Sequence, residues 1–210
     1  METKKHIFCA LDFSNLELTL SFAKKIKDHI GGIKLGLEFF TKNGPLGVEK
    51  LKKIGLPIFL DLKLHDIPNT VYKALKNLFN QKVWMTNIHL LGGEEMIQAA
   101  CAAKKHSKSE AFLIGVTILT SLDDNKFKKM GFDNKISELV KNLSLIACKN
   151  NVDGVVCSAK EVPEIKEKVG KDFITVTPGI RIEQNNDDQS RVATLEEATK
   201  NGSDFIVLGR

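Results

Sequence analysis

Eight short runs of apolar and β-branched residues recur along this chain, with helical stretches between them. The runs are Ile7–Asp12, Gly32–Leu35, Ile58–Lys63, Met85–Leu90, Phe112–Leu119, Gly154–Cys157, Phe173–Thr177 and Phe205–Leu208. Such an alternation is typical of a parallel sheet that is covered by helices. Eight repeats favour an α/β protein with a closed (β/α)8 TIM barrel over a doubly wound open sheet. The glycine-rich turn that an open sheet usually carries after its first strand is absent here.

The boundaries of the helices follow from local signals. An apolar stripe precedes the sixth run, and Ser14 followed by Glu17 predicts a capping box at the start of the first helix. The sequence stops at Arg210, directly after the eighth run. We therefore expect a barrel that lacks the helix after strand eight.

Length and composition narrow the class of protein. The 210 residues, 42% of them apolar, suffice for one large core, and no linker divides them, so we expect a single domain over residues 1–210. The first residues do not resemble a signal peptide, and no apolar run reaches membrane-spanning length. We expect a cytoplasmic protein that does not bind membranes.

Charge and cysteine usage exclude two further classes. The net charge is +5, but the lysines are scattered among 26 acidic residues, so nucleic-acid binding is not predicted. The four cysteines are widely spaced and form no C-x-x-C pair, which argues against a zinc site or a disulfide framework. We expect them to be small buried apolar residues, and we expect Trp84 and the twelve phenylalanines to be core residues.

Charged side chains gather at the ends of the predicted strands, where barrels of this kind carry their chemistry. Asp12 ends the first run and Lys34 lies near the end of the second. Asp61 and Lys63 alternate in the third run, so they should point to the same side, and Asp66 begins the following loop. A structural ion pair would explain two of these charges. It would not explain the others, which favours a functional site.

A second polar group follows the seventh and eighth runs. The segment Thr177–Arg181 reads Thr-Pro-Gly-Ile-Arg and opens a polar loop that contains Gln189, and the eighth run is followed by Gly209 and Arg210. Loops at these positions commonly bind phosphate through backbone N–H groups and arginine. The alternative is an ordinary Pro-Gly turn with two solvated arginines.

Together these motifs resemble the orotidine 5'-phosphate decarboxylase family, specifically its bacterial branch. The matching segments are Leu-Asp-Phe at 11–13, Ile-Lys-Leu-Gly at 33–36, Phe-Leu-Asp-Leu-Lys-Leu-His-Asp-Ile-Pro-Asn-Thr at 59–70, Asn-Ile-His at 87–89, Leu-Thr-Ser at 119–121, Gly-Val-Val-Cys-Ser at 154–158, Thr-Pro-Gly-Ile-Arg at 177–181 and Leu-Gly-Arg at 208–210. They span the whole chain in the right order, and the segment 59–70 is the most specific.

The resemblance implies the decarboxylation of orotidine 5'-phosphate to UMP in pyrimidine biosynthesis, without a cofactor or a metal. It implies a charged network of Lys34, Asp61, Lys63 and Asp66, in which Lys63 is the proton donor. It also implies a homodimer in which Asp66 and Thr70 reach into the site of the partner subunit.

The resemblance further assigns the residues that bind the substrate. Asp12 and Lys34 would hold the ribose hydroxyls, and Thr120 would contact the pyrimidine. The phosphate and its covering loop would be bound by Arg181, Gln189, Gly209 and Arg210.

Two other functions compete with this interpretation. Magnesium-dependent sugar-phosphate decarboxylases and synthases of the same superfamily carry a similar Asp-x-Lys-x-x-Asp segment. They place an acidic metal ligand on strand two, where this chain has Lys34, and a lysine would repel the metal. A non-catalytic nucleotide-binding barrel would be expected to have lost at least one of the four network residues, all of which are present.

Overall fold

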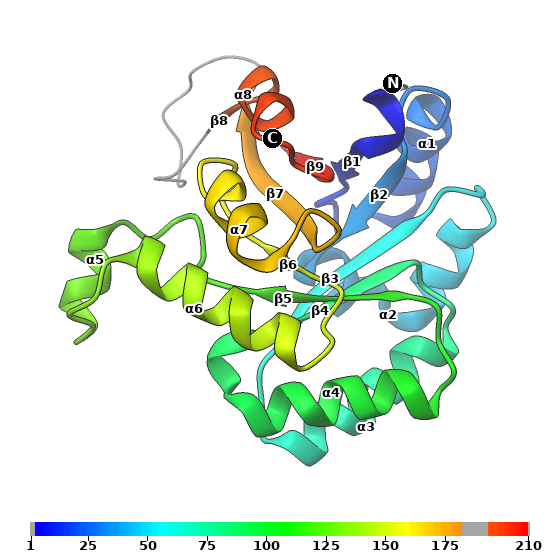
Figure 1. The fold of residues 1–210 in the computed structure, drawn as a ribbon. Helices are drawn as coiled ribbons and strands as arrows, with labels where there is room; N and C mark the ends of the chain where they lie inside the picture. The colour runs from blue at the N-terminus through cyan, green and yellow to red at the C-terminus, as the bar shows by residue number, and fades with distance from the viewer. Residues whose placement is uncertain (1–2, 182–192, 210) are drawn as a thin grey trace.

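The strands form a closed ring. A computed structural model describes residues 3–181 and 193–209 (Figure 1). Its strands are β1 (Ile7–Ala10), β2 (Gly32–Leu35), β3 (Ile58–Leu64), β4 (Met85–His89), β5 (Phe112–Val116), β6 (Gly154–Val156), β7 (Ile174–Arg181), β8 (Ala193–Thr194) and β9 (Phe205–Leu208). The hydrogen-bonded order is β6-β5-β4-β3-β2-β1-β9-β7-β8, and a parallel pairing of β6 with β7 closes the barrel.

Each of the eight predicted runs overlaps one strand of this ring, which confirms the (β/α)8 prediction, although β3 and β7 extend beyond their predicted ends. The eighth predicted run is β9. The additional strand β8 has only two residues and pairs with the end of β7, where Ala193 lies opposite Ile180. A strand this short has no periodicity, so no pattern along the chain predicts it.

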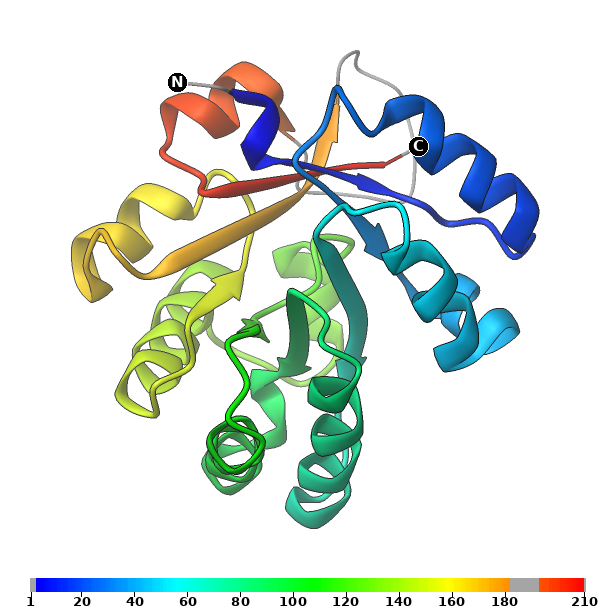
Figure 2. The same cartoon turned by 90° about the vertical axis from the view of Figure 1, so that its right-hand side faces the viewer.

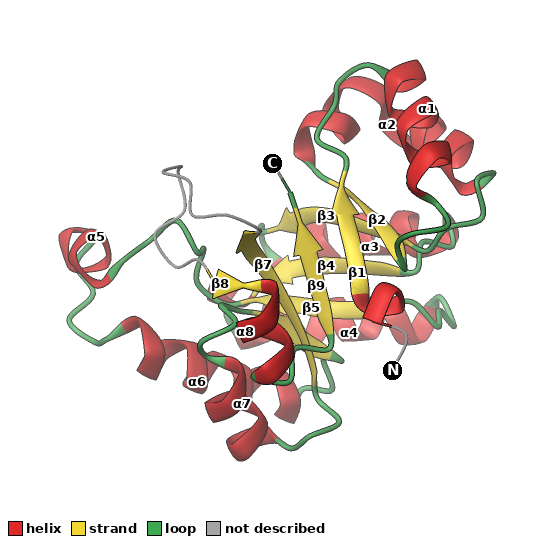
Figure 3. Ribbon diagram, turned by 90° about the horizontal axis from the view of Figure 1, so that it is seen from above, coloured by secondary structure: helices red, strands yellow, loops and turns green. Residues whose placement is uncertain are grey.

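Helices connect the strands and lie outside the ring, as Figure 2 shows. They are α1 (Leu16–Ile26), α2 (Leu37–Lys52), α3 (Pro68–Asn80), α4 (Glu94–His106), α5 (Asp124–Lys129), α6 (Ile136–Lys149), α7 (Val162–Val169) and α8 (Leu195–Lys200), with short 3₁₀ segments η1 (Thr3–His6) and η2 (Leu90–Gly92). Helices α3 and α4 pack against each other, whereas α5 projects away from the strands beyond α6 (Figure 3). No helix in the described part of the chain is long and apolar enough to span a membrane.

Two local predictions were wrong. The N-cap of α1 is Asn15, whose Oδ1 accepts a hydrogen bond from Leu18 N at 2.9 Å, so the predicted capping box at Ser14 does not form. Asn15 has the extended backbone that a cap requires, and its side-chain oxygen serves as well as a serine hydroxyl. Among the cysteines, all predicted to be buried, Cys157 is buried, Cys9 and Cys101 are only partly buried, and Cys148 is exposed on α6.

The interior of the barrel is packed with side chains. Its buried members are Phe8, Phe59, Met85, Ile114, Val176 and Val207. Near the N-terminal ends of the strands, the Trp84 ring lies 5.2 Å from Phe8, 5.0 Å from Phe112 and 5.1 Å from Phe205, centroid to centroid. These four rings are here called the aromatic floor. Trp84 packs against the buried interior as predicted but is only partly buried, and among the phenylalanines, predicted to be core residues, Phe132 is 37% exposed. The cavity lined by the predicted charged residues lies at the opposite, C-terminal ends of the strands.

Candidate active site

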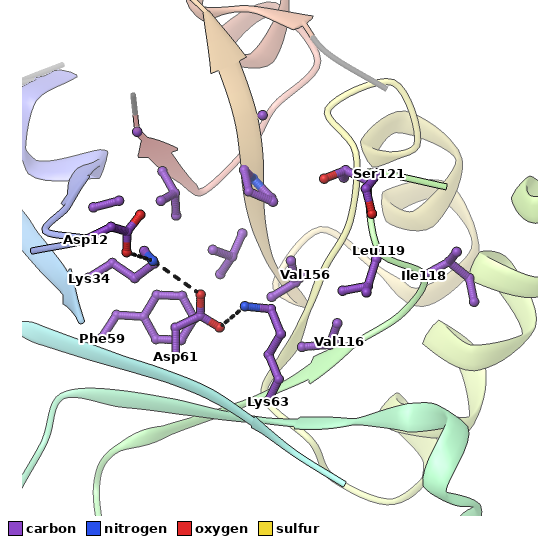
Figure 4. A pocket seen from close by; sticks show the side chains of 17 residues that line it. Asp12, Lys34, Phe59, Asp61, Lys63, Val116, Ile118, Leu119, Ser121 and Val156 are labelled. Carbon is purple, nitrogen blue, oxygen red and sulfur yellow. Dashed lines mark hydrogen bonds and ion pairs between the residues drawn. The ribbon is translucent and has the colours of Figure 1, made fainter. Parts of the chain in front are cut away.

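A cavity of about 280 Å³ opens at the C-terminal ends of the strands (Figure 4). Its charged lining residues are Asp12, Lys34, Asp61 and Lys63, as the sequence predicted. Its other lining residues are Ala10, Phe59, Val116, Ile118, Leu119, Thr120, Ser121, Val156, Val176, Pro178, Gly179, Val207 and Gly209. The charged side chains therefore face a largely apolar wall, which suits a ligand with one polar and one apolar side.

The four charged residues form one connected network. Lys63 Nζ donates to Asp61 Oδ1 at 2.7 Å, and Lys34 Nζ donates to Asp12 Oδ1 at 2.9 Å. Lys34 Nζ also lies 3.7 Å from Asp61 Oδ2, which joins the two pairs. Positive and negative groups thus alternate across the ends of β1, β2 and β3.

Asp61 is the most enclosed carboxylate of the network, with 7% of its surface exposed. Burial opposes its ionisation, but the charges of Lys63 and Lys34 and the hydrogen bonds from Lys63 and Asn87 outweigh that effect. The pKa of Asp61 consequently lies below its ordinary value. Asp61 is therefore an anion at neutral pH.

The strand that carries Asp61 and Lys63 leaves its regular ladder at this point. Leu60 pairs with Thr86 and Leu64 pairs with Ile88, so three residues of β3 face the single residue Asn87 of β4. Lys63 has a φ of 50°, in the left-handed region that residues with a Cβ rarely adopt. The side chains of Asp61 and Lys63 do meet, but a bulge brings them together rather than the simple alternation that the sequence predicted.

Gly36 leaves room for the second ion pair. A Cβ at this position would lie 3.0 Å from Lys34 Nζ and 3.1 Å from Asp12 Oδ1. Contacts this short would require the two charged groups to shift by a few tenths of an ångström. The glycine in the Ile-Lys-Leu-Gly segment thus allows the Lys34–Asp12 pair to sit against the start of α2.

The remaining predicted residues fall into three groups. Thr120, 8% exposed, and Gly209 line the cavity. Asp66 and Thr70 are exposed and are not among its lining residues. Outside the described residues lie Gln189, Arg210 and the side chain of Arg181.

A histidine pair lies beside the network. The rings of His65 and His89 are 5.3 Å apart, and His89 Nδ1 is buried without a hydrogen-bond partner among the described residues. Burial, followed by the charges of His65 and Lys63, lowers the pKa of His89 from 6.5 to about 4. His89 is therefore neutral at physiological pH. No group of three or more His, Cys, Asp or Glu residues in the described part of the chain is placed to hold a metal ion.

Asn87 is the component of this site to which the sequence assigned no role. It is completely buried, its Nδ2 donates to Asp61 Oδ1 at 2.7 Å, and its Oδ1 accepts from Lys63 N at 2.8 Å. Its place within the Asn-Ile-His segment was visible in the sequence. Its bonds to β3 were not, because they depend on the bulge.

Comparisons with known proteins agree with this geometry. The family model "Orotidine 5'-phosphate decarboxylase / HUMPS family" matches residues 5–210. An orotidine 5'-phosphate decarboxylase of Carboxydothermus hydrogenoformans is 45% identical over 98% of this chain and 88% of its own length. One from Legionella pneumophila (strain Corby) is 45% identical over 97% and 90%. The crystal structure of the orotidine 5'-phosphate decarboxylase from Lactobacillus acidophilus matches with a TM-score of 0.84 and 36% identity, covering 97% of this chain and 89% of that chain.

Proposed function

Since this chain belongs to the orotidine 5'-phosphate decarboxylase / HUMPS family, we propose that it removes CO2 from orotidine 5'-phosphate to give UMP. The supporting observation is the Lys63 ammonium group, which lines the cavity and is bonded to the buried Asp61 carboxylate. The reaction would belong to pyrimidine biosynthesis and would be carried out by residues 1–210 as one domain.

The chemistry requires a cation at one carbon atom. When the bond between C6 and the carboxylate breaks, CO2 leaves and the electron pair stays on C6, which has no adjacent carbonyl to accept it. The Lys63 ammonium group stabilises this negative charge and then donates a proton to C6. Lys63 regains its proton from solvent, and no cofactor or metal takes part.

The neighbouring charges keep Lys63 ready for this step. Asp61 holds the ammonium group in its charged form and orients it through the 2.7 Å hydrogen bond. Asp66, from the partner subunit, completes the alternation of charges. A lysine held in place before the substrate binds requires little rearrangement in the transition state.

Other predicted residues bind the substrate. Asp12 and Lys34 hold the ribose hydroxyls, and Thr120 contacts the pyrimidine. The phosphate is bound by Arg181, Gln189, Gly209 and Arg210. The positions of Thr120 and Gly209 on the same cavity as the charged network support this assignment.

The active unit is a homodimer with shared sites. Asp66 and Thr70 flank Ile67, which is 67% exposed, and neither lines the cavity of its own chain. Two further large apolar side chains are exposed near the start of neighbouring helices, namely Leu37 at 55% and Leu91 at 41%. Exposed apolar groups of this size favour burial against another protein surface. A second copy on this surface would receive Asp66 and Thr70 in its site.

One assay tests the proposed reaction against both competing functions. Purified protein in excess EDTA should consume orotidine 5'-phosphate. The reaction is measured as the loss of substrate absorbance, and UMP should be identified as the product. Turnover that appears only after magnesium is added would contradict the metal-free mechanism. UMP binding without any turnover would favour a non-catalytic nucleotide-binding barrel.

A further inference from the structure

We propose that Asn87 is a positioning residue, which sets the location of the Lys63 ammonium group by bonding to both the backbone of Lys63 and the carboxylate of Asp61. This inference rests on the proposed function, because Lys63 is the group that it positions. It goes beyond the family resemblance, which gave Asn87 no role.

Lys63 has a backbone conformation that is unusual for a residue in a strand. Among the described residues, the other non-glycine residues with positive φ are Lys82, Lys108 and Asn151, and each lies in the turn that follows a helix. Left-handed residues are common at such helix ends. Lys63 is different because it lies inside a strand, where this conformation persists only when the surrounding structure enforces it.

Asn87 supplies that enforcement. The bulge removes Lys63 N–H from the regular ladder between β3 and β4, and Asn87 Oδ1 accepts this N–H at 2.8 Å. A backbone N–H group left without a partner away from water would destabilise this conformation. The side chain of β4 thus replaces the backbone partner that the bulge takes away.

The same amide fixes the carboxylate. Asn87 Nδ2 and Lys63 Nζ both donate to Asp61 Oδ1 at 2.7 Å, while Asp61 Oδ2 faces Lys34. Each carboxylate oxygen is therefore directed at a different lysine. Only a short side chain with an acceptor and a donor on one planar group can make both contacts. Aspartate lacks the donor, and leucine lacks both.

The hydrogen bond from Asn87 also affects the pKa of Asp61. Asp61 is faced by Lys63 from its own strand, Lys34 from β2 and His89 from β4, with Asp12 behind Lys34. Loss of the Asn87 donor leaves the other groups in place. It removes one hydrogen bond to the ionised carboxylate, so the pKa of Asp61 should rise.

Asn87→Asp and Asn87→Ala test the proposal, with Thr86→Val as the matched control. Thr86 is also completely buried on β4, and its hydroxyl donates to Leu60 O at 3.1 Å, away from the network. In the Asn87 variants we expect kcat to fall about 100-fold. We expect UMP affinity to stay within about threefold of the parent, because the ammonium group is misplaced while the binding residues remain. The control should lose stability but keep its kcat.

A titration separates positioning from a purely structural role. We expect ¹³C NMR of the Asp61 carboxyl to show a higher pKa in both Asn87 variants and an unchanged pKa in Thr86→Val. An unchanged Asp61 titration, or a kcat within about twofold of the parent in folded Asn87→Asp, would overturn the proposal. This variant keeps the shape of the side chain, so it remains informative if Asn87→Ala does not fold. If the parent itself fails to convert orotidine 5'-phosphate, the proposed function fails, and the titration still tests Asn87.

Discussion

Lys63 Nζ lies 2.7 Å from Asp61 Oδ1, and both residues belong to the stretch of β3 that has left its ladder with β4. The contact is therefore fixed by an irregular backbone rather than by the pleat of a strand. The position of the ammonium group consequently depends on the bulge as much as on the choice of lysine.

Replacing Lys63 with alanine should abolish measurable turnover. General acid catalysis contributes about 10²–10⁴-fold, and a preorganised electrostatic group contributes a further factor of about 10²–10³. UMP should still bind, as measured by calorimetry, because the ribose and phosphate contacts remain. Lys25→Ala, an exposed residue on α1, is the control and should behave like the parent. Near-normal turnover in Lys63→Ala would show that another group protonates C6.

Subunits that are inactive for different reasons should restore activity when mixed. Lys63→Ala and Asp66→Ala should each be inactive, but a heterodimer has one site with an intact Lys63 and an intact Asp66. After full exchange of equal amounts, half of the dimers are mixed and half of their sites are intact, so about a quarter of the parental activity is expected. Exchange is verified by native mass spectrometry. No recovery after verified exchange would rule out a shared site.

His89 should make the protein less stable toward acid. Its pKa is about 4 in the folded chain against 6.5 ordinarily, so below pH 6.5 the unfolded chain binds the proton more readily. The free energy of unfolding should therefore fall as the pH is lowered from 6.5 to 4, and this fall should be smaller in His89→Gln. Urea unfolding at several pH values measures it, with the exposed His29→Gln as control. Equal slopes in the parent and His89→Gln would contradict the prediction.

Gly36→Ala should impair substrate binding more than folding. The backbone of Gly36 has a φ of −95°, which alanine tolerates, but the new methyl group would crowd Lys34 Nζ and Asp12 Oδ1. Since these groups are proposed to hold the ribose, we expect KM to rise about tenfold, equivalent to about 1.4 kcal/mol. Thermal unfolding should remain close to that of the parent. A large loss of stability with an unchanged KM would indicate that Gly36 serves packing alone.

The sequence predicted the parts of this molecule that repeat or that carry charge. Periodic apolar runs located the eight strands of the ring, and the charges of Asp12, Lys34, Asp61 and Lys63 marked the cavity. Both signals are local, because burial and charge can be inferred for each residue from its neighbours along the chain.

Features that depend on pairing between strands were not predictable in this way. The bulge opposite Asn87 arises from the register of β3 on β4, and nothing in Ile58–Leu64 itself indicates that the ladder is interrupted. The role of Asn87 follows from that register. The cap at Asn15 rather than Ser14 was missed for a smaller reason, since adjacent residues can both cap a helix and the choice depends on how α1 packs.

The aromatic floor closes the barrel at the N-terminal ends of its strands, and the cavity opens at the opposite end. Phe8, Trp84, Phe112 and Phe205 pack together at that end, so a small molecule would not pass between the strands there. A substrate and its product would then pass through the same opening, one after the other. A product that stays bound in the cavity would block the binding of substrate, so we expect inhibition by the product to be competitive.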